Sequence, residues 1–255
     1  MLKENLLPEI LAIVHECGDI MLRATDIDRK IHQKEGKGNF VTDYDSRVQK
    51  VLKTRLLALM PEAVFLGEED QMDHTDISQG YAFIVDPIDG TANFIRGYHA
   101  SCISVALAEN GYPVLGVIYN PYQKETYYAE KGKGAYCNGE RIQTSERTLE
   151  EGLILFGVAP YNKELMQKSF EIAYRYVSRG EDLRRSGSAA IDLCMVASGR
   201  AEFFFEMVLS PWDYAAGALL VEEAGGFTGD LEGRPLTYDR KQTVTARAPK
   251  VELLK

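Results

Sequence analysis

The sequence predicts an α/β protein in which sheets and helices form stacked layers. Strand-like segments follow one another between residues 63 and 137, as in an antiparallel meander. After residue 150, strand-like and helix-like segments alternate, which is typical of a sheet covered by helices. The chain has 255 residues, with 45% hydrophobic and 26% charged residues, a balance found in folded soluble proteins. This length suits one large domain or two small ones.

Two helices and a meander of strands are predicted for the first half. Residues 5–23 and 43–60 each place apolar side chains on one helical stripe. Residues 30–40 between them are polar and contain glycines, so we expect a hairpin or a loop there. Asn110-Gly111 predicts a tight hairpin turn, because this pair favours positive φ. The expected strands lie near residues 63–66, 81–85, 101–108, 113–119, 125–130 and 134–137.

The second half is predicted to alternate between strands and helices and then to form a hairpin. In chain order, the expected elements are a strand at 152–158, a helix at 162–178, a short strand near 182–184, a helix at 188–198, a strand at 201–206, a helix at 211–224 and a hairpin near 226–236. Such alternation predicts a sheet with helices packed on it.

Charge and composition narrow the class of protein. The net charge of −9 disfavours a broad electrostatic grip on nucleic acid. The four cysteines lie far apart and form no Cys-x-x-Cys pair, so we expect neither disulfides nor a zinc site. No apolar run approaches the roughly 20 residues that span a membrane, and the N-terminus shows no signal-peptide core. These features predict a cytoplasmic protein without membrane or nucleic-acid partners.

The run Asp86-Pro-Ile-Asp-Gly-Thr91 is the most informative segment of the chain. It presents two carboxylates, three residues apart, at the end of the strand predicted at 81–85, and Gly90 permits a tight turn after them. Mg²⁺ takes oxygen ligands and usually binds one or two carboxylates together with water and substrate phosphate. The run therefore predicts a site where metal ions hold a phosphate that this acidic chain would otherwise repel.

Two helix starts contain acids that have both an ordinary and a functional interpretation. Ser210-Pro-Trp-Asp213 and Thr42-Asp-Tyr-Asp45 have the spacing of helix N-caps, which alone accounts for Asp213 and Asp45. In the functional alternative, Asp213 also points at a bound cation. Asp45 then accepts a proton from Thr91, which in turn orients a nucleophilic water molecule.

Three further segments also have both an ordinary and a functional interpretation. Gly67-Glu-Glu-Asp70 follows a strand-like run, and taken alone it indicates a solvated acidic turn. Ser186-Gly-Ser-Ala-Ala190 leads into a helix, where small residues serve either close packing or the approach of a ligand to backbone N–H groups. Glu206 ends a predicted strand, and an exposed glutamate is its ordinary interpretation.

Together, and in this order, these segments resemble the inositol monophosphatase family of Mg²⁺-dependent, lithium-sensitive phosphatases. Asp86-Pro-Ile-Asp-Gly-Thr-Ala-Asn-Phe94 is similar to the central signature of that family. Ser210-Pro-Trp-Asp-Tyr-Ala-Ala-Gly217, followed by Glu222-Glu-Ala-Gly-Gly226, is similar to its C-terminal signature. The likeness extends from the first helix to about residue 230. It implies a five-layered αβαβα sandwich, one domain over residues 1–255 with sub-domains of roughly 1–145 and 146–255.

The resemblance also implies a set of metal ligands. Glu68, Asp86 and the main-chain carbonyl of Ile88 would hold one Mg²⁺ ion. Asp86, Asp89 and Asp213 would hold a second, and a third, weaker ion would lie near Glu68. Paired ions lie roughly 3.5–4 Å apart, which requires a shared carboxylate, and Asp86 is placed to supply it.

Catalytic and substrate-binding roles follow from the same resemblance. Thr91 and Asp45, with Glu68 through the third ion, would orient the attacking water. The N–H groups of Gly90 and Thr91 would cradle the phosphate. The residues expected to contact the alcohol half of the substrate are Asp89, Ala189 and Glu206. No Cys or Ser nucleophile beside a His is visible, so we prefer direct attack by water to a covalent intermediate.

The resemblance leaves some points open. The family offers a lysine from a mobile loop near the third metal, and both Lys34 and Lys37 qualify. The stretch Thr243-Val-Thr-Ala-Arg-Ala-Pro249 departs from the pattern common near that end, which leaves the last strand undetermined. Relatives are usually homodimers, and we expect the same here.

Inositol 1-phosphate is the expected substrate, a small phosphate ester. Fructose 1,6-bisphosphate, a 3′-phosphoadenosine nucleotide and NADP are alternatives, because related enzymes share the metal carboxylates. The continuation Thr91-Ala-Asn-Phe94 is more similar to the inositol group than to the nucleotide group. A further alternative is a scaffold that binds a macromolecular partner.

Overall fold

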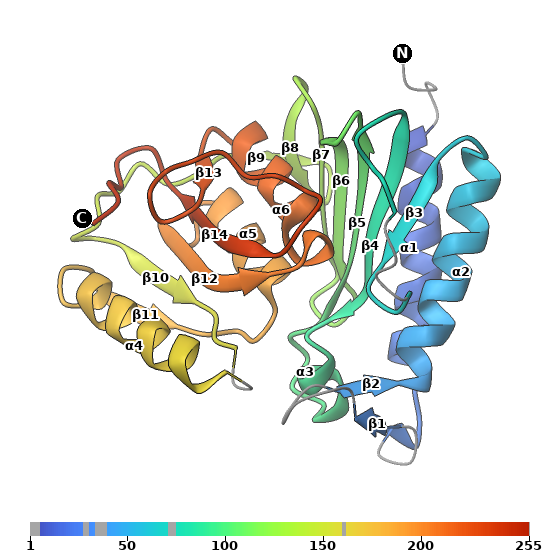
Figure 1. The fold of residues 1–255 in the computed structure, drawn as a ribbon, viewed down its shortest axis with the longest axis horizontal. Coiled ribbons are helices and arrows are strands. Elements are labelled where there is room, and N and C mark those ends of the chain that lie inside the picture. Colours follow the sequence, from blue (N-terminus) through green and yellow to red (C-terminus); the bar gives the residue numbers. More distant parts are fainter. Residues whose placement is uncertain (1–5, 28–30, 34–39, 71–74, 160–161, 255) are drawn as a thin grey trace.

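The computed structural model describes residues 6–27, 31–33, 40–70, 75–159 and 162–254. Figure 1 shows helices, a sheet, helices, a second sheet and a helix in successive layers. This arrangement confirms the predicted αβαβα sandwich. Three hydrophobic clusters fill the spaces between the layers.

The first outer layer consists of α1 (Leu6–Leu22) and α2 (Asp43–Leu59), which both match the predicted helices. Between them, β1 (Ile31–Gln33) and β2 (Phe40–Thr42) pair as antiparallel strands. The described part of residues 30–40 is thus a hairpin, one of the two predicted alternatives. Lys34 and Lys37 lie outside the described residues.

The first sheet has seven strands in the order β3-β4-β5-β6-β7-β8-β9. All neighbours pair antiparallel except β3 and β4, which are parallel. Asn110 and Gly111 have φ values of 51° and 84°, which confirms the predicted tight turn between β5 and β6. The prediction missed β9. The strands are β3 (Val64–Gly67), β4 (Tyr81–Asp89), β5 (Cys102–Glu109), β6 (Tyr112–Asn120), β7 (Glu125–Glu130), β8 (Gly134–Cys137) and β9 (Glu140–Ile142).

This sheet is buried on both faces, and successive residues of a strand serve different clusters. Phe83 and Val85 of β4 pack with α1 and α2, whereas Ala82 and Ile84 face the middle layer. Side chains alternate in this way because a strand has a period of two residues. Burial on both faces also explains why β4 is a nearly continuous apolar run.

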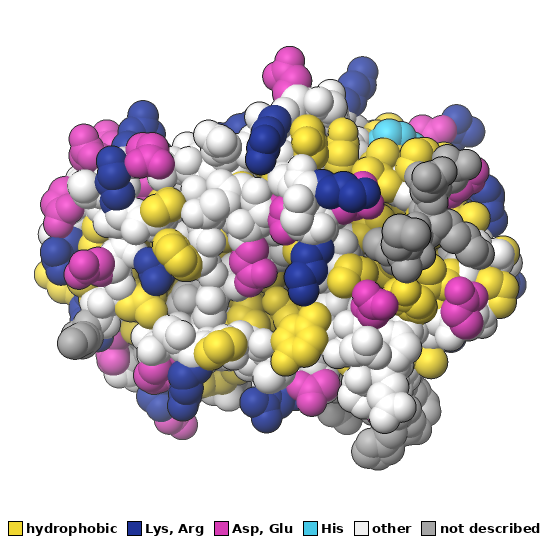
Figure 2. Space-filling view, turned by 90° about the horizontal axis from the view of Figure 1, so that it is seen from above, with side chains coloured by type: hydrophobic (Ala, Val, Ile, Leu, Met, Phe, Trp, Pro, Cys, Tyr) yellow, Lys and Arg dark blue, Asp and Glu magenta, His cyan; other side chains and the backbone are white. Residues whose placement is uncertain are grey.

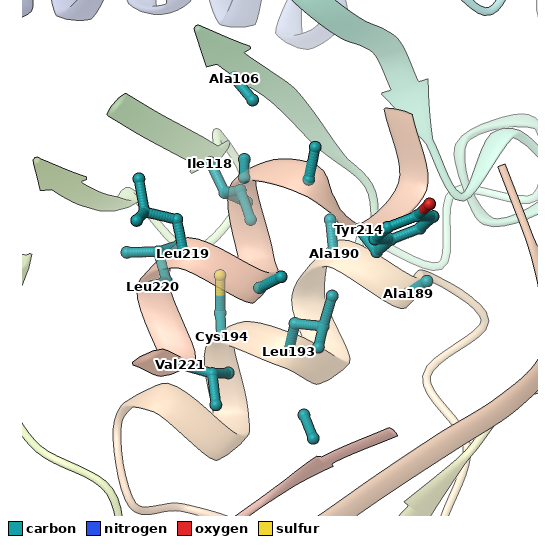
Figure 3. Packing of buried hydrophobic residues seen from close by; sticks show 14 of the residues in the cluster. Ala106, Ile118, Ala189, Ala190, Leu193, Cys194, Tyr214, Leu219, Leu220 and Val221 are labelled. Atoms are coloured by element: carbon teal, nitrogen blue, oxygen red, sulfur yellow. The ribbon is translucent and has the colours of Figure 1, made fainter. Parts of the chain in front are cut away.

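The middle layer contains α5 (Ala189–Ala197) and α6 (Pro211–Glu223), packed between the two sheets. Figure 3 shows Leu219, Leu220 and Val221 of α6 beside Leu193 and Cys194 of α5, with sheet residues such as Ala106 and Ile118 in the same cluster. The backbones of β6 and α6 approach each other closely here, because a Cβ on Gly116 of β6 would lie 2.9 Å from the carbonyl oxygen of Ala216.

The second sheet has five strands in the order β11-β10-β12-β14-β13. Its outer face packs against α4 (Lys163–Val177) through Phe203, Phe205 and Tyr176. β10 pairs parallel with β11 and β12, while β14 pairs antiparallel with β12 and β13. The strands are β10 (Leu153–Phe156), β11 (Asp182–Arg184), β12 (Phe203–Leu209), β13 (Phe227–Gly229) and β14 (Gln242–Arg247).

The hairpin predicted near 226–236 is wrong. β13 pairs with β14, and the intervening residues turn away, held by hydrogen bonds from Arg234 to Asp230. Pro235 cannot donate to a ladder, which disfavours a strand at that point. The strand that pairs with β13 is β14, which lies in the stretch that the sequence left undetermined, near residues 243–249. Val244 and Ala246 of this strand are fully buried.

None of the described helices is long and apolar enough to cross a bilayer. On the face shown in Figure 2, basic and acidic side chains are interspersed. A short helix that was not predicted, α3 (Thr91–Ile95), follows β4 directly. Figure 1 places it at the end of β4, where the chain leaves the first sheet.

Candidate functional site

A cavity of about 260 Å³ lies where the end of β4, the start of α3 and the start of α5 come together. Most of the predicted site residues line it, although they are remote in the chain. They are Glu68, Asp89, Gly90, Thr91, Ala189, Glu206 and Asp213. Of the remaining three, Asp86 is buried behind this wall, and Asp45 and Ile88 contact it through Thr91.

The end of β4 positions the central acids. The strand was predicted to end at Val85, but it continues through Asp89, with a register shift against β5 between Asp86 and Asp89. This irregularity turns the backbone enough for the Ile88 N–H to donate to Asp86 Oδ1 at 3.0 Å. Gly90 then adopts a φ of 85°, and a Cβ there would lie 2.8 Å from the Ala100 carbonyl oxygen.

Burial makes the negative charges of Asp86, Asp89 and Asp213 energetically unfavourable, which raises the pKa values of all three. Asp86 is 1% exposed, and burial raises its pKa well above the usual range, with Glu68 and Asp89 raising it further. Burial likewise raises the pKa of Asp213 well above the usual range. The pKa of Asp89 rises to about 6, again through burial, against hydrogen bonds from Ser188 and Ala190 that lower it.

The donor set fits a hard divalent cation. A side-chain hydrogen bond with Glu68 also helps to raise the pKa of Asp86, and a bound cation would offset the repulsion between such neighbouring carboxylates. Carboxylate and carbonyl oxygens are the ligands that Mg²⁺ prefers. Within the described residues, no three His, Cys, Asp or Glu side chains are already arranged as they would be to hold a metal ion.

Asp45 and Thr91 form a second polar centre beside the acids. Thr91 Oγ1 lies 3.2 Å from Asp45 Oδ1 and 3.1 Å from the Ile88 carbonyl oxygen, and both can accept from its hydroxyl. Asp45 is fully buried, and burial raises its pKa to about 6 although hydrogen bonds from Thr42 lower it. The ordinary interpretation of Asp45 is confirmed, because it completes the capping box of α2. Its contact with Thr91 is compatible with the functional interpretation, which stays a prediction.

The start of α5 holds a carboxylate of the protein itself. Ser188 Oγ and the Ala190 N–H donate to Asp89 Oδ2 at 2.6 and 2.7 Å. Ser188 is also the N-cap of the helix, since its hydroxyl accepts from Ile191. Residues 186–190 had two interpretations, close packing or capping and the approach of a ligand to backbone N–H groups. The structure favours the first, because this run caps α5 and contacts Asp89 closely. Ala189 also lines the cavity.

The second half of the chain contributes two charged residues that the sequence interpretation missed, Arg185 and Asp192. Burial raises the pKa values of both Asp192 and Glu206 to about 8. Glu206 fits beside β10 because Gly157 has no side chain: a Cβ there would overlap the Glu206 carboxylate. Asp192 follows Ala189 by three residues, so helical spacing could have placed both on one face.

Asp213 is fixed by the capping box predicted for α6. Its Oδ2 accepts from the Ser210 N–H at 2.7 Å, and its own N–H donates to the Ser210 carbonyl at 3.0 Å. The neighbouring Trp212 carbonyl accepts from Ser104 of β5 at 3.2 Å, which ties the start of α6 to the first sheet. The cap and a position on the cavity wall therefore coexist.

A model of the inositol monophosphatase family matches residues 3–254. The chain belongs to the inositol monophosphatase family. It is 34% identical over 238 residues to the inositol-1-monophosphatase of Bacillus subtilis, covering 93% of this chain and 90% of that protein. It is 35% identical over 218 residues to the Nus factor SuhB of Xylella fastidiosa, covering 85% of this chain and 78% of that protein.

Solved structures of relatives share the fold. The extragenic suppressor protein suhB from Bartonella henselae matches with a TM-score of 0.87 and 33% identity, covering 97% of this chain and 95% of that one. An IMPase from Thermotoga maritima matches with a TM-score of 0.85 and 32% identity, covering 96% and 92%. Membership of this family makes the protein a phosphatase.

Proposed function

We propose that this protein is a Mg²⁺-dependent phosphomonoesterase that hydrolyses inositol 1-phosphate. The observation that carries this proposal is the gathering of acids from three separate segments at one cavity: Glu68, Asp89 and Asp213 line it, and Asp86 is buried beside them. Such mutually repelling, buried carboxylates are stabilised by divalent cations. A phosphate ester that binds there needs those same cations, because the acids alone would repel it.

We assign the metal ligands as the family resemblance implies. Glu68, Asp86 and the Ile88 carbonyl would hold one ion, Asp86, Asp89 and Asp213 would hold a second, and a third, weaker ion would lie near Glu68. When bound, such ions lower the pKa of water and stabilise the charge that develops on the phosphate. The buried position of Asp86, beside both Glu68 and Asp89, supports its role as the shared carboxylate.

The chain's own groups orient the reactants. The Thr91 hydroxyl donates to Asp45, so its oxygen lone pairs are free to accept from a water molecule in the cavity. Asp45, with a pKa of about 6, can take up the proton that passes from that water through Thr91. The N–H groups of Gly90 and Thr91 hold the phosphate, and Asp89, Ala189 and Glu206 contact the alcohol.

The test is phosphate release from inositol 1-phosphate with and without Mg²⁺. The wild-type protein should be active only with the metal, and Asp89→Asn should lose nearly all activity. Asp182→Asn is the matched control, since Asp182 is exposed on β11 and pairs with Arg184 away from the cavity. Full activity of Asp89→Asn would refute the metal assignment. We also expect Li⁺ to inhibit, and unchanged turnover in tens of millimolar LiCl would contradict this.

Other phosphate esters are the nearest alternatives. One solved relative, a Staphylococcus aureus protein named SaIMPase-II, is described with 2′-AMP bound, at 26% identity and a TM-score of 0.83. A panel of inositol 1-phosphate, fructose 1,6-bisphosphate, a 3′-phosphoadenosine nucleotide and NADP at saturating Mg²⁺ distinguishes the substrates. A preference of tenfold or more for a nucleotide would overturn our choice.

A second candidate function is binding of a macromolecular partner. Several relatives are named Nus factor SuhB, including the protein of Escherichia coli, which is 36% identical over 202 residues. The names are in tension with our expectation that this protein has no nucleic-acid partner. That expectation remains a prediction. A pull-down with the Asp89→Asn protein tests it: a partner retained without activity would support a dual role.

Two further expectations also remain predictions, a homodimer and a cytoplasmic location. The homodimer rests on the family resemblance. Light scattering on the purified protein would measure its mass in solution, and a single-chain mass of 28.5 kDa at micromolar concentration would contradict the homodimer.

A further inference from the structure

A second cavity, of about 530 Å³, lies away from the cavity around Asp89, which we call the catalytic cavity. Three separate segments form its wall: residues 75–78 before β4, residues 110–112 at the turn between β5 and β6, and residues 237–239 before β14. None of these residues lines the catalytic cavity. β4 begins beside the second cavity and ends at the catalytic one, and Figure 1 shows that the start of β4 and α3 lie at opposite ends of the sheet. We call the second one the tyrosine cavity.

Two tyrosines form an aromatic corner in the wall of the tyrosine cavity. Tyr112 is 61% exposed, whereas Tyr238 is only 6% exposed, and their rings meet edge to face with centroids 6.4 Å apart. Tyr238 also packs against the fully buried ring of Tyr214, with centroids 5.6 Å apart. The Tyr214 hydroxyl donates to the Thr237 carbonyl oxygen at 2.6 Å, which fixes this side of the wall from behind. The faces of aromatic rings attract cations.

Two hydroxyl groups of the same wall have no hydrogen-bond partner within the described part of the chain. Thr237 Oγ1 is buried without one. The Tyr238 hydroxyl also forms no hydrogen bond with a described residue, although this side chain is more than nine-tenths buried. Burial raises the pKa of Tyr238, and the negative charge of Glu222 raises it further, so the phenol stays neutral. Buried polar groups are normally hydrogen-bonded, and each of these oxygens can accept from a ligand in the cavity.

The charged side chains of this wall are all acidic. Asp76 and Asp239 are both exposed, and no Lys, Arg or His of the described residues lines the tyrosine cavity. Hydrogen bonds from the side chain and backbone of Ser78 lower the pKa of Asp76, the backbone one at 2.8 Å. Asp76 is therefore ionised at neutral pH. The wall repels anions such as phosphate esters and attracts cations.

We propose that the tyrosine cavity binds a short aliphatic diamine as a dication. One ammonium group lies against the ring of Tyr112 and donates to the hydroxyl oxygens of Thr237 and Tyr238. The other pairs with Asp76 or Asp239, and the methylene chain between them packs on the tyrosine rings. A primary ammonium is preferred to a quaternary one, because only N–H groups can donate to the two hydroxyls. This site does not depend on the proposed function, since it shares no residue with the catalytic cavity.

Isothermal titration calorimetry of the full chain with putrescine tests the site. Saturating Mg²⁺ competes for the acids of the catalytic cavity, and about 0.15 M NaCl screens weak binding to the acidic surface. We expect Tyr238→Phe to raise the Kd about tenfold, because it removes a hydrogen bond to a charged group and keeps the ring. Asp239→Asn should raise the Kd about threefold, as expected for an exposed ion pair. Tyr174→Phe is the matched control, since Tyr174 is exposed on α4 and does not line the cavity.

Putrescine methylated fully at both nitrogens is the comparison ligand, because it keeps both charges and the chain but has no N–H group. It should bind at least about fivefold more weakly than putrescine, and equal affinity would overturn the role of the two hydroxyls. A wild-type Kd in both Tyr238→Phe and Asp239→Asn, or no measurable binding, overturns the site. If only Asp213→Asn weakens binding, the dication occupies the catalytic cavity and the inference is equally wrong. The titration measures no turnover, so failure of the proposed function would leave its result intact.

Discussion

The N-termini of α2 and α6 contain the same local motif but use its aspartate differently. Thr42 with Asp45 and Ser210 with Asp213 each form a capping box. In both, one carboxylate oxygen accepts from the N-cap N–H at 2.7 Å. The second oxygen distinguishes them: that of Asp45 accepts from Thr91 at 3.2 Å, whereas no described residue donates to that of Asp213.

This difference shows that capping and function are compatible in one carboxylate. A cap needs a single oxygen, and it fixes the rotamer of the whole side chain. The remaining oxygen is then held in place for another partner, a hydroxyl at Asp45 and, in our proposal, a metal ion at Asp213. Local sequence identifies the cap, but the element packed against it decides the second role.

The largest expected effect is a difference in phosphatase activity between Asp213→Asn and Asp45→Asn. Asparagine keeps an oxygen that can accept from the cap, so Asp213→Asn and Asp45→Asn should both fold. We expect Asp213→Asn to lower kcat/KM by on the order of 10³-fold, because a metal ligand stabilises the transition state by several kcal/mol. Asp45→Asn should cost on the order of 10²-fold, as expected for loss of a general base. Phosphate release from inositol 1-phosphate measures both, and equal losses would contradict the distinction.

The second prediction concerns the pH dependence of Asp45 in metal-free protein. Its pKa rises from 3.8 to about 6 on folding, so the unfolded chain loses this proton first as the pH increases. The free energy of unfolding should therefore fall between about pH 4 and pH 6, by roughly 3 kcal/mol from this group. In Asp45→Asn this part of the decline should be missing. Urea unfolding in EDTA at several pH values measures it, and parallel curves for the two proteins would refute the pKa shift.

The third prediction uses metal binding itself. A ligand at 100 times its Kd stabilises the folded state by about 2.7 kcal/mol. Saturating Mg²⁺ should therefore raise the melting temperature of wild type and of Asp45→Asn, whose metal ligands are intact. Asp213→Asn should gain much less, because it lacks one ligand. A full Mg²⁺ response in Asp213→Asn would show that its free oxygen does not face the metal.

Much of this fold follows from the sequence because its signals are local. Helical periodicity identified α1 and α2, and Asn110-Gly111 identified a turn. The pairing of β13 with β14 was missed, because it joins strands separated by a long turn and no local pattern records which strand lies next to which. The extension of β4 to Asp89 was missed for a similar reason, since it depends on pairing with β5.

In the candidate site, too, local sequence signals identified some residues, whereas others depend on contacts with distant parts of the chain. The acids that follow strands or start helices stand out as motifs, and the structure brings them to one cavity. Arg185 and Asp192 do not stand out, because no local pattern marks them as part of a cavity wall that they share with distant residues. The contact of Asp89 with Ser188 and Ala190 likewise joins two motifs that the sequence presents about 100 residues apart.

The smallest expected effect concerns the caps alone. Thr42 is fully buried, its hydroxyl donates to Asp45 Oδ2, and it accepts from the N–H groups of Tyr44 and Asp45. Removing an N-cap hydroxyl costs about 0.5–2 kcal/mol, so Thr42→Ala should lie near the upper end of that range. Ser210→Ala should lie near the lower end, because the Ser210 hydroxyl makes no side-chain cap hydrogen bond comparable to those of the Thr42 hydroxyl.

Melting temperatures measure this pair of caps, at roughly 2–4 °C per kcal/mol for a chain near this size. Thr42→Ser retains the hydroxyl and is the matched control, and its melting temperature should stay close to that of wild type. If Ser210→Ala destabilises the protein more than Thr42→Ala, the two capping boxes do not divide their hydrogen bonds as the structure indicates. A larger loss for Thr42→Ala would instead confirm that the Thr42 hydroxyl stabilises its helix start more than the Ser210 hydroxyl does.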